Sequence, residues 1–333
     1  MKVTGRELPL RRFIAAIFYI TVFMLSACST NTIKLAEDEN FVVLIAGHGD
    51  SLRSLAKLYL GDESMYWLIA DINGVREVET GQELLIPLKI DNPTGVFVDG
   101  YQTIPILAYH RVSRKFTGKM SVSIEMFDEQ MSYLKRNDYR VITLSEMIPF
   151  LRGERPIPRR AVIITFDDGH HTIYQNAFPI LKKYGFPATL FVYSDYINKG
   201  GLTWRQIDEM TSSGLISLQS HSKSHTNLAI RLDDEDEARY HSRVLQEIVV
   251  PTELMEKRMA ARVFGYAYPY GDTNDYVIEQ LKKHGYELGL TVYPGGNPAF
   301  GNPFLLRRAM IFGDEGMEAF REELKTFRTV DLH

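Results

Sequence analysis

One cysteine, Cys28, is all that this 333-residue chain contains, so a disulfide bond within the chain is excluded. Lys and Arg number 38 against 42 Asp and Glu, and the formal charge of −4 offers no basic surface of the kind that binds nucleic acid. The apolar run at residues 13–25 is too short for a comfortable transmembrane helix. What is left is a globular chain, 45% hydrophobic and 24% charged, whose length favours two domains.

The N-terminal residues have the pattern of an export signal. Basic residues precede the apolar run, and Leu25-Ser26-Ala27-Cys28 ends it. This ending resembles a bacterial lipobox, which implies a signal peptide at residues 1–27 and a lipid anchor on Cys28. An ordinary signal peptide with an incidental cysteine is the alternative. By its similarity to lipoprotein sorting signals, Ser29 favours the cell envelope, on the outer membrane facing the periplasm.

A small α/β module is predicted after a polar tether at residues 28–40. The expected elements are a strand at 41–45, helices at 51–58 and 64–72, and a strand at 81–87. This βααβ order, with the stretches GHGDSLRSLA and GQELLIP, resembles a LysM domain over residues 41–89. The resemblance implies binding of glycans that contain N-acetylglucosamine, chiefly peptidoglycan. A module kept for spacing or for protein contacts is the alternative.

Residues 90–103, with Pro93, Gly95 and Gly100, are expected to form an interdomain linker. Between residues 104 and 320, short apolar runs alternate with helical stretches, which predicts an α/β fold with a parallel sheet, and so many repeats favour a barrel. The predicted elements are 104–109, 126–137, 139–142, 161–166, 172–184, 188–192, 204–213, 216–219, 242–261, 263–267, 273–284 and 287–292.

Two neighbouring carboxylates, Asp167 and Asp168, follow an apolar run and precede a glycine, which indicates a buried strand ending in a turn. Ligands bind at the carboxyl ends of parallel strands. Downstream, His221 and His225 are spaced to converge on one cation if their segment forms a helical turn or a tight loop. One Asp and two His form a three-ligand set with open positions, typical of a catalytic metal site. A capping Asp pair with two surface histidines is the alternative.

The stretches TFDDG and HSKSH resemble the first two motifs of the NodB-homology polysaccharide deacetylases, carbohydrate esterase family 4. Residues 105–110 and 176–191 are similar to strands and a helix of that family, and Tyr268-Pro269-Tyr270-Gly271 is similar to its third motif. The resemblance covers residues 104–312. It implies a distorted (β/α) barrel, often of seven strands, and metal-dependent removal of N-acetyl groups from a polysaccharide.

The same resemblance assigns roles to residues. Asp168, His221 and His225 match the metal ligands, and Asp167 matches the base that takes a proton from water. Zinc is the expected divalent metal, with cobalt or nickel as alternatives, because zinc lowers the pKa of water from ~15.7 to ~7. The backbone amide of Tyr270 matches the donor to the developing oxyanion, a contact worth ~10²–10³ in rate.

The chain departs from the family pattern in two places. Ala267 stands where many members have an arginine, and the late Leu-x-His that carries their general acid is missing after Phe300. In the poly-N-acetylglucosamine deacetylases, which the chain resembles more closely, a histidine at the end of the first strand is the proposed acid, and His110 matches it. The alternative for His110 is a rim histidine that orients a metal ligand. Arg308 is a candidate to orient Asp167 in place of the missing arginine.

The sequence therefore predicts a lipid-anchored envelope enzyme that removes N-acetyl groups from a polysaccharide containing GlcNAc. The LysM-like module favours peptidoglycan as the substrate, and the catalytic segment favours poly-N-acetylglucosamine. One alternative is a non-catalytic glycan-binding lipoprotein, which the missing late histidine supports. Another is an O-acetyl polysaccharide esterase, which the LysM-like module disfavours.

Overall fold

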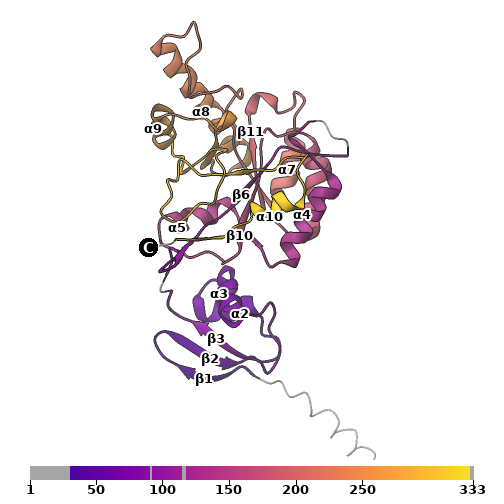
Figure 1. The fold of residues 1–333 in the computed structure, drawn as a ribbon, viewed down its shortest axis with the longest axis vertical. Helices are drawn as coiled ribbons and strands as arrows, with labels where there is room; N and C mark the ends of the chain where they lie inside the picture. The colour runs from indigo at the N-terminus through magenta and orange to yellow at the C-terminus, as the bar shows by residue number, and fades with distance from the viewer. Residues whose placement is uncertain (1–30, 91, 115–117, 331–333) are drawn as a thin grey trace, which may run out of the picture. The chain divides into compact units, whose positions relative to one another are not determined.

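The computed structural model describes residues 31–90, 92–114 and 118–330. The chain divides into two compact units, one ending at Ile90 and the other beginning at Asp91 (Figure 1). Among the described residues, none of the helices combines the length and the apolar character needed to cross a membrane. The predicted signal peptide and its lipidation site, Cys28, lie outside the described residues.

The first unit is a three-stranded antiparallel sheet, in the order β1-β2-β3, with two helices. Its elements are β1 (Ile33–Glu37), β2 (Phe41–Ile45), α2 (Leu52–Leu60), α3 (Tyr66–Asn73) and β3 (Glu83–Pro87). Buried residues alternate with half-buried ones along β2, so one face of the sheet forms a core with the helices. The predicted βααβ order is present.

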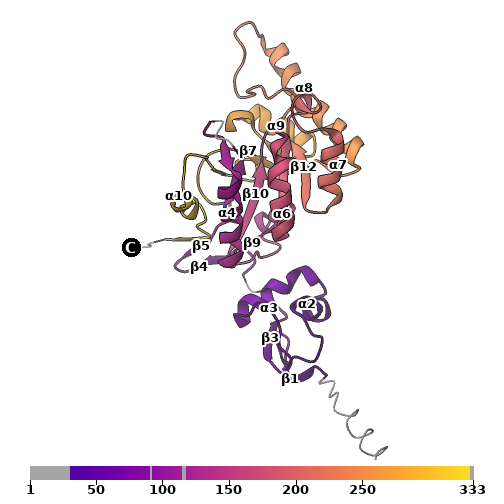
Figure 2. The ribbon, with the colours of Figure 1, turned by 90° about the vertical axis from the view of Figure 1, so that its right-hand side faces the viewer.

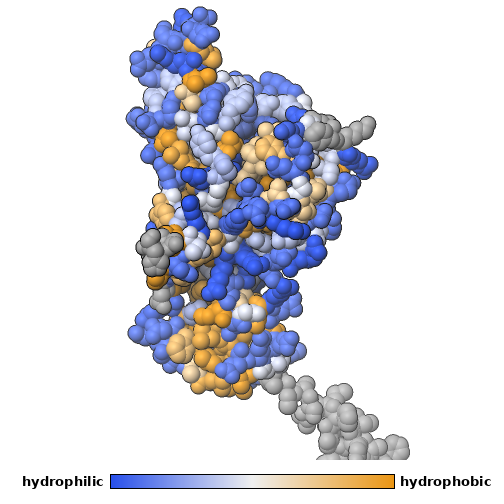
Figure 3. Space-filling model, in the orientation of Figure 1, coloured by the Kyte–Doolittle hydropathy of each residue, from blue (hydrophilic) through white to orange (hydrophobic). Residues whose placement is uncertain are grey.

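Strand β1 corrects the prediction of a tether at residues 28–40. All five of its residues are exposed, and the strand is held by its pairing with β2. Its sequence therefore lacks the strict alternation of apolar and polar residues by which a half-buried strand is predicted. Ile33 and Leu35 of this strand expose 52% and 51% of their surface. Figure 3 shows apolar side chains gathered on the visible face of this unit.

Asn73, the last residue of α3, connects this helix to β3, which is an edge strand of the sheet. Its Nδ2 donates to the carbonyl of Leu85 at 2.7 Å and to that of Ile69 at 2.8 Å, and its Oδ1 accepts from the Leu85 amide at 2.9 Å. Gly74 then ends the helix in a left-handed conformation at φ 65°. The helix expected at residues 64–72 ends one residue beyond its predicted limit, and the Asn73 side chain covers backbone groups that an edge strand would otherwise expose.

The second unit is built on a curved parallel sheet in the order β14-β13-β12-β11-β10-β6-β15, with β9 beside the start of β10. Leu306 also bridges to Leu290, so the chain just before β15 returns to β14. The strands are β6 (Ile106–Tyr109), β9 (Arg140–Val141), β10 (Ala161–Phe166), β11 (Ala188–Val192), β12 (Ile216–Ser220), β13 (Gly265–Ala267), β14 (Leu288–Leu290) and β15 (Ala309–Met310). The predicted α/β fold with a parallel sheet is confirmed as a half-barrel.

Helices alternate with these strands, and Figure 2 shows α4, α6 and α7 along one side of the sheet. They are α4 (Ile124–Arg136), α5 (Met147–Leu151), α6 (Phe178–Tyr184), α7 (Trp204–Ser212), α8 (Glu237–Met259), α9 (Asp275–Lys283) and α10 (Met317–Glu322). A π-helical turn at residues 173–177 leads into α6.

Strand β10 is buried along its whole length. Val162, Ile164 and Phe166 belong to one apolar core, whereas Ala161 and Ile163 belong to a second one on the other face. A parallel strand covered on both faces has a continuous apolar sequence, which is why its bounds could be predicted. Side chains alternate between the faces, so Asp167 continues the set that contains Ala161 and Ile163.

The predicted linker at residues 90–103 is not irregular. It contains β4 (Val96–Phe97) and β5 (Gly100–Gln102), and β5 pairs with β16 (Phe327–Thr329) near the far end of the chain. The second unit therefore extends beyond the predicted limits of 104 and 320 on both sides. A short parallel pair, β7 (Arg111–Ser113) with β8 (Ser121–Ser123), was likewise not predicted. Strands of two or three residues are too short for periodicity to reveal.

Candidate active site

The predicted site residues lie at the carboxyl ends of neighbouring parallel strands. His110 follows β6, Asp167 and Asp168 follow β10, His221 follows β12, and Tyr270 lies in the turn after β13. The carboxyl edge of a parallel sheet is where loops from many strands can meet around one ligand.

Three of the predicted site residues, among them His225 four positions after His221, form a cluster that suits a metal ion. The candidate ligand atoms of Asp168, His221 and His225 all lie within 4.8 Å of one another. Oδ1 of Asp168 is 3.7 Å from Nε2 of His221 and 3.4 Å from Nε2 of His225. His221 is buried and its Nδ1 donates to the carbonyl of Ala267 at 2.8 Å, which turns Nε2 toward the carboxylate. One carboxylate and two imidazoles fit a divalent transition metal and leave coordination positions open.

Burial lowers the pKa of His221 below its ordinary value, although the two nearby aspartates act in the opposite direction. The imidazole is therefore held neutral, which is the form that can donate a lone pair to a metal.

The backbone around this cluster is unusual. Seven non-glycine residues in the described part of the chain have a positive φ, and four of them belong to the site: Asp168 (69°), Ser222 (76°), His225 (61°) and Tyr270 (62°). Such conformations cost about 1–3 kcal/mol each for most residues and persist only where the surroundings impose them. In the same turn, a Cβ on Gly169 (φ 80°) would lie 2.8 Å from Cγ1 of Val192, so this position requires glycine.

Asp167 is held by Arg308, and both side chains are buried. Nη1 and Nη2 of the arginine donate to the two carboxylate oxygens, each at 2.7 Å, and Nε donates to the carbonyl of Thr291 at 2.9 Å. Burial alone would raise the pKa of Asp167, but the charge of Arg308, with smaller help from His221, holds that pKa well below its ordinary value. The carboxylate is thus ionised, and each oxygen keeps a lone pair for a further hydrogen bond.

His110 and Tyr270 lie at the same edge. Nδ1 of His110 is buried and has no hydrogen-bond partner within the part of the chain that is described, and the side chain is near enough to lower the pKa of Asp167 slightly. Tyr270 is 62% exposed, and its ring packs edge-on against that of His225 at 4.9 Å between centroids. The predicted role of Tyr270 rests on its backbone amide, which lies in the left-handed turn.

Sequence reasoning missed an aromatic pair beside the cluster. Tyr193 and Tyr196 follow strand β11 and stack at 5.0 Å, and Tyr193 also lies 5.3 Å from His225. His225 thus contacts two aromatic rings, those of Tyr193 and Tyr270, and the faces of such rings suit the apolar face of a sugar. The signal was available, because these tyrosines come directly after an apolar strand that shares the carboxyl edge.

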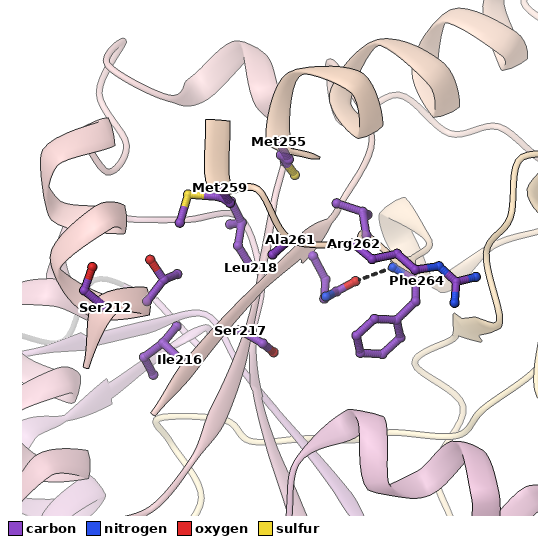
Figure 4. A pocket seen from close by; sticks show the side chains of 12 residues that line it. Ser212, Ile216, Ser217, Leu218, Met255, Met259, Ala261, Arg262 and Phe264 are labelled. Carbon is purple, nitrogen blue, oxygen red and sulfur yellow. Dashed lines mark hydrogen bonds between the residues drawn. The ribbon is translucent and has the colours of Figure 1, made fainter. Parts of the chain in front are cut away.

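A cavity of about 420 Å³ lies elsewhere in this unit. Figure 4 shows it lined by Ile216 at the start of β12, by Met255 and Met259 of α8, and by Phe264. Its lining follows β12 from Ile216 to Gln219 and includes none of the candidate metal ligands, so it is a separate cavity.

Comparisons with known proteins agree with the geometry. A family model described as polysaccharide deacetylase matches residues 154–289. The poly-beta-1,6-N-acetyl-D-glucosamine N-deacetylase of Staphylococcus epidermidis is 31% identical over 230 residues, which are 62% of this chain and 78% of that protein. The chain belongs to the polysaccharide deacetylase family.

Other members of the family extend the likeness. The poly-beta-1,6-N-acetyl-D-glucosamine N-deacetylase of Escherichia coli is 28% identical over 257 residues. The match covers 66% of this chain and 38% of that longer protein. The structure of the Streptococcus pyogenes deacetylase PplD in complex with acetate superposes with a TM-score of 0.60 and 26% identity, over 67% of this chain and 98% of that one. The prediction that this chain is a polysaccharide deacetylase is confirmed.

Proposed function

We propose that this deacetylase is a metal-dependent hydrolase of N-acetyl groups on a polysaccharide that contains GlcNAc. The observation that carries the proposal is the Asp168, His221 and His225 cluster, with its ligand atoms within 4.8 Å, next to a buried carboxylate that is not part of it. A site that cleaves an amide needs a nucleophilic water, a polarised carbonyl and a proton for the leaving amine.

The residues divide this work between them. Asp168, His221 and His225 would hold the metal, which supplies Lewis acidity that makes water a nucleophile at neutral pH. Asp167 accepts the proton of that water, and Arg308 fixes its carboxylate in one orientation. The backbone amide of Tyr270 donates to the acetyl oxygen as negative charge develops there. His110 gives the proton to the leaving amine, since its ring stands at the end of β6 on the same edge.

The substrate and location follow from two further arguments. The relatives from Escherichia coli and Staphylococcus epidermidis both carry the name poly-beta-1,6-N-acetyl-D-glucosamine N-deacetylase, which supports a GlcNAc polymer. The first unit, by its likeness to LysM domains, supports binding of a GlcNAc-containing glycan such as peptidoglycan. A lipid anchor on Cys28 would hold both units at the cell envelope, on the outer membrane facing the periplasm.

A pair of variants tests the metal site. We expect His221→Ala to lose the bound divalent ion, measured by mass spectrometric metal analysis, because it removes one of three ligands. Asp167→Asn should keep the metal and lose turnover, because it removes the base and leaves the ligands. Full metal content in His221→Ala would disprove the ligand assignment.

A substrate comparison tests the reaction. Acetate release should be measured on poly-β-1,6-GlcNAc, on peptidoglycan and on an O-acetylated hemicellulose, with Asp167→Asn as the blank. Release from either of the first two supports N-deacetylation and identifies the polymer. Release from the third alone would make the enzyme an O-acetyl esterase, and binding without release would favour a non-catalytic glycan-binding protein.

A further inference from the structure

The segment between the two candidate histidine ligands has a conformation that needs support. Ser222 and His225 both have a left-handed backbone, at φ 76° and 61°, and neither is glycine. Within the segment, Oγ of Ser222 accepts from the His225 amide at 2.9 Å. One hydrogen bond within a loop leaves the amides of the intervening residues, Lys223 and Ser224, to be satisfied from outside.

The short helical turn at residues 194–196, just after strand β11, supports this segment from one side. The amide of Ser194 donates to the carbonyl of Ser222 at 3.1 Å, and the amide of Asp195 donates to that of Lys223 at 2.9 Å. Nζ of Lys223 forms an ion pair with Oδ2 of Asp195 at 2.7 Å. These contacts satisfy carbonyl groups of the segment and the charge of its lysine, but not its amides.

The amides are satisfied by Glu247, a residue of α8 that sequence reasoning did not select. Its Oε2 accepts from the amides of Lys223 at 2.9 Å and Ser224 at 2.8 Å, and its Oε1 accepts from Oγ of Ser224 at 2.6 Å. The side chain is only 5% exposed. A buried carboxylate that receives three hydrogen bonds from one short loop is a strong and directional restraint on that loop.

We propose that Glu247 is a positioning residue for the metal site, resting on the proposed metal-dependent function. The two residues that it holds lie between His221 and His225, so their position sets the separation and orientation of the two imidazoles. Partners that orient metal ligands change metal affinity about 10- to 100-fold when they are removed. Glu247 itself touches neither the metal nor the substrate, and its effect passes through the backbone of the loop.

The test measures metal affinity rather than activity. The full chain with Glu247→Gln should bind Zn²⁺ about 10- to 100-fold more weakly in a chelator competition assay, because the amide group replaces an acceptor oxygen with a donor. Substituted with Co²⁺, it should also show an altered visible absorption spectrum. Ser224→Ala removes one of the three hydrogen bonds, so it should weaken binding by less, and it carries the test should Glu247→Gln not fold.

Glu256 supplies the matched control. It lies on the same helix, and its Oε1 accepts a backbone amide, that of Val263 at 2.8 Å, away from the metal ligands. Glu256→Gln should leave Zn²⁺ affinity within about twofold of the parent. Equal loss in both variants, or parental affinity in a folded Glu247→Gln, would overturn the proposal. Failure of the parent to bind any divalent metal would overturn the proposed function together with it.

Discussion

Arg308 is the hydrogen-bonding partner of Asp167, and its side chain has no exposure to solvent. Two of its nitrogen atoms donate to the carboxylate of Asp167, and the third donates to the carbonyl of Thr291. Arg308→Lys keeps the positive charge but loses the two parallel hydrogen bonds. We therefore expect a folded protein with a lower kcat, by about 10- to 100-fold. Arg308→Met leaves the buried carboxylate without its counter-charge and should lower the free energy of unfolding by about 3–5 kcal/mol.

Steady-state kinetics and urea denaturation separate these two effects. The double variant Arg308→Met with Asp167→Asn serves as the control, since removing both charges should restore much of the lost stability. If Arg308→Lys turned over at the parental rate, the arginine would have a structural role alone.

His110 is the residue whose role is easiest to test by choice of substrate. General acid catalysis contributes about 10²–10⁴ in rate, and an amide needs it because its leaving amine must be protonated. His110→Ala should therefore lose about that factor in kcat on an N-acetyl substrate and keep its metal. On an activated aryl ester, whose leaving group needs no proton, the loss should be much smaller. Equal losses on both substrates would assign His110 to structure instead.

Residues could be predicted from the sequence where a local signal marked them. Asp167, Asp168, His221 and His225 stand in short motifs next to apolar strands, so their convergence was predictable. Glu247 had a weaker signal: it lies with Val244, Ile248, Pro251 and Met255 on the buried face of α8, where a carboxylate is out of place. Its partner loop is more than twenty residues away, and nothing in the sequence connects the two.

At the scale of elements, long apolar strands were predicted well and short strands were not. Strands β10 and β11 have the predicted bounds, because both are buried on both faces. Strands β4, β5 and β16 contain two or three residues each, and the pairing of β5 with β16 joins segments near the two ends of the second unit. Their pairing is fixed by the tertiary fold, and a local pattern cannot indicate it.

The contact between α3 and β3 gives a prediction at this scale. Asn73→Ala would leave the amide and carbonyl of Leu85 without their side-chain partner, and because Leu85 is half-buried we expect a loss near the lower end of the about 1–3 kcal/mol that a buried group costs. We expect the first unit to unfold at a lower urea concentration, followed by the fluorescence of Trp67 in a Trp204→Phe background. Ile72→Ala is the control: this neighbour on α3 is 51% exposed, so its loss should change stability by less than about 0.5 kcal/mol. An Asn73→Ala variant as stable as this control would contradict the prediction.

For the whole molecule, the two units have separate apolar cores, so the glycan binding proposed for the first unit and the deacetylation by the second can be assigned to different parts of one chain. The predicted lipid anchor on Cys28 would determine the membrane at which both units act. Cys28→Ala should move the protein from the membrane fraction to the soluble envelope fraction, or block its processing, because two or more acyl chains are needed for firm anchoring. A variant that is processed normally and stays with the membrane would disprove the anchor.

The left-handed residues of the catalytic unit bear on attempts to improve the enzyme. A directed-evolution screen for heat resistance rewards any change that relieves an unfavourable backbone conformation, and glycine or asparagine at positions 222 and 225 would do so. His225 is a candidate ligand, and Ser222 holds its amide. Clones selected for survival at high temperature should therefore be enriched in inactive protein, and a useful screen has to score acetate release after heating.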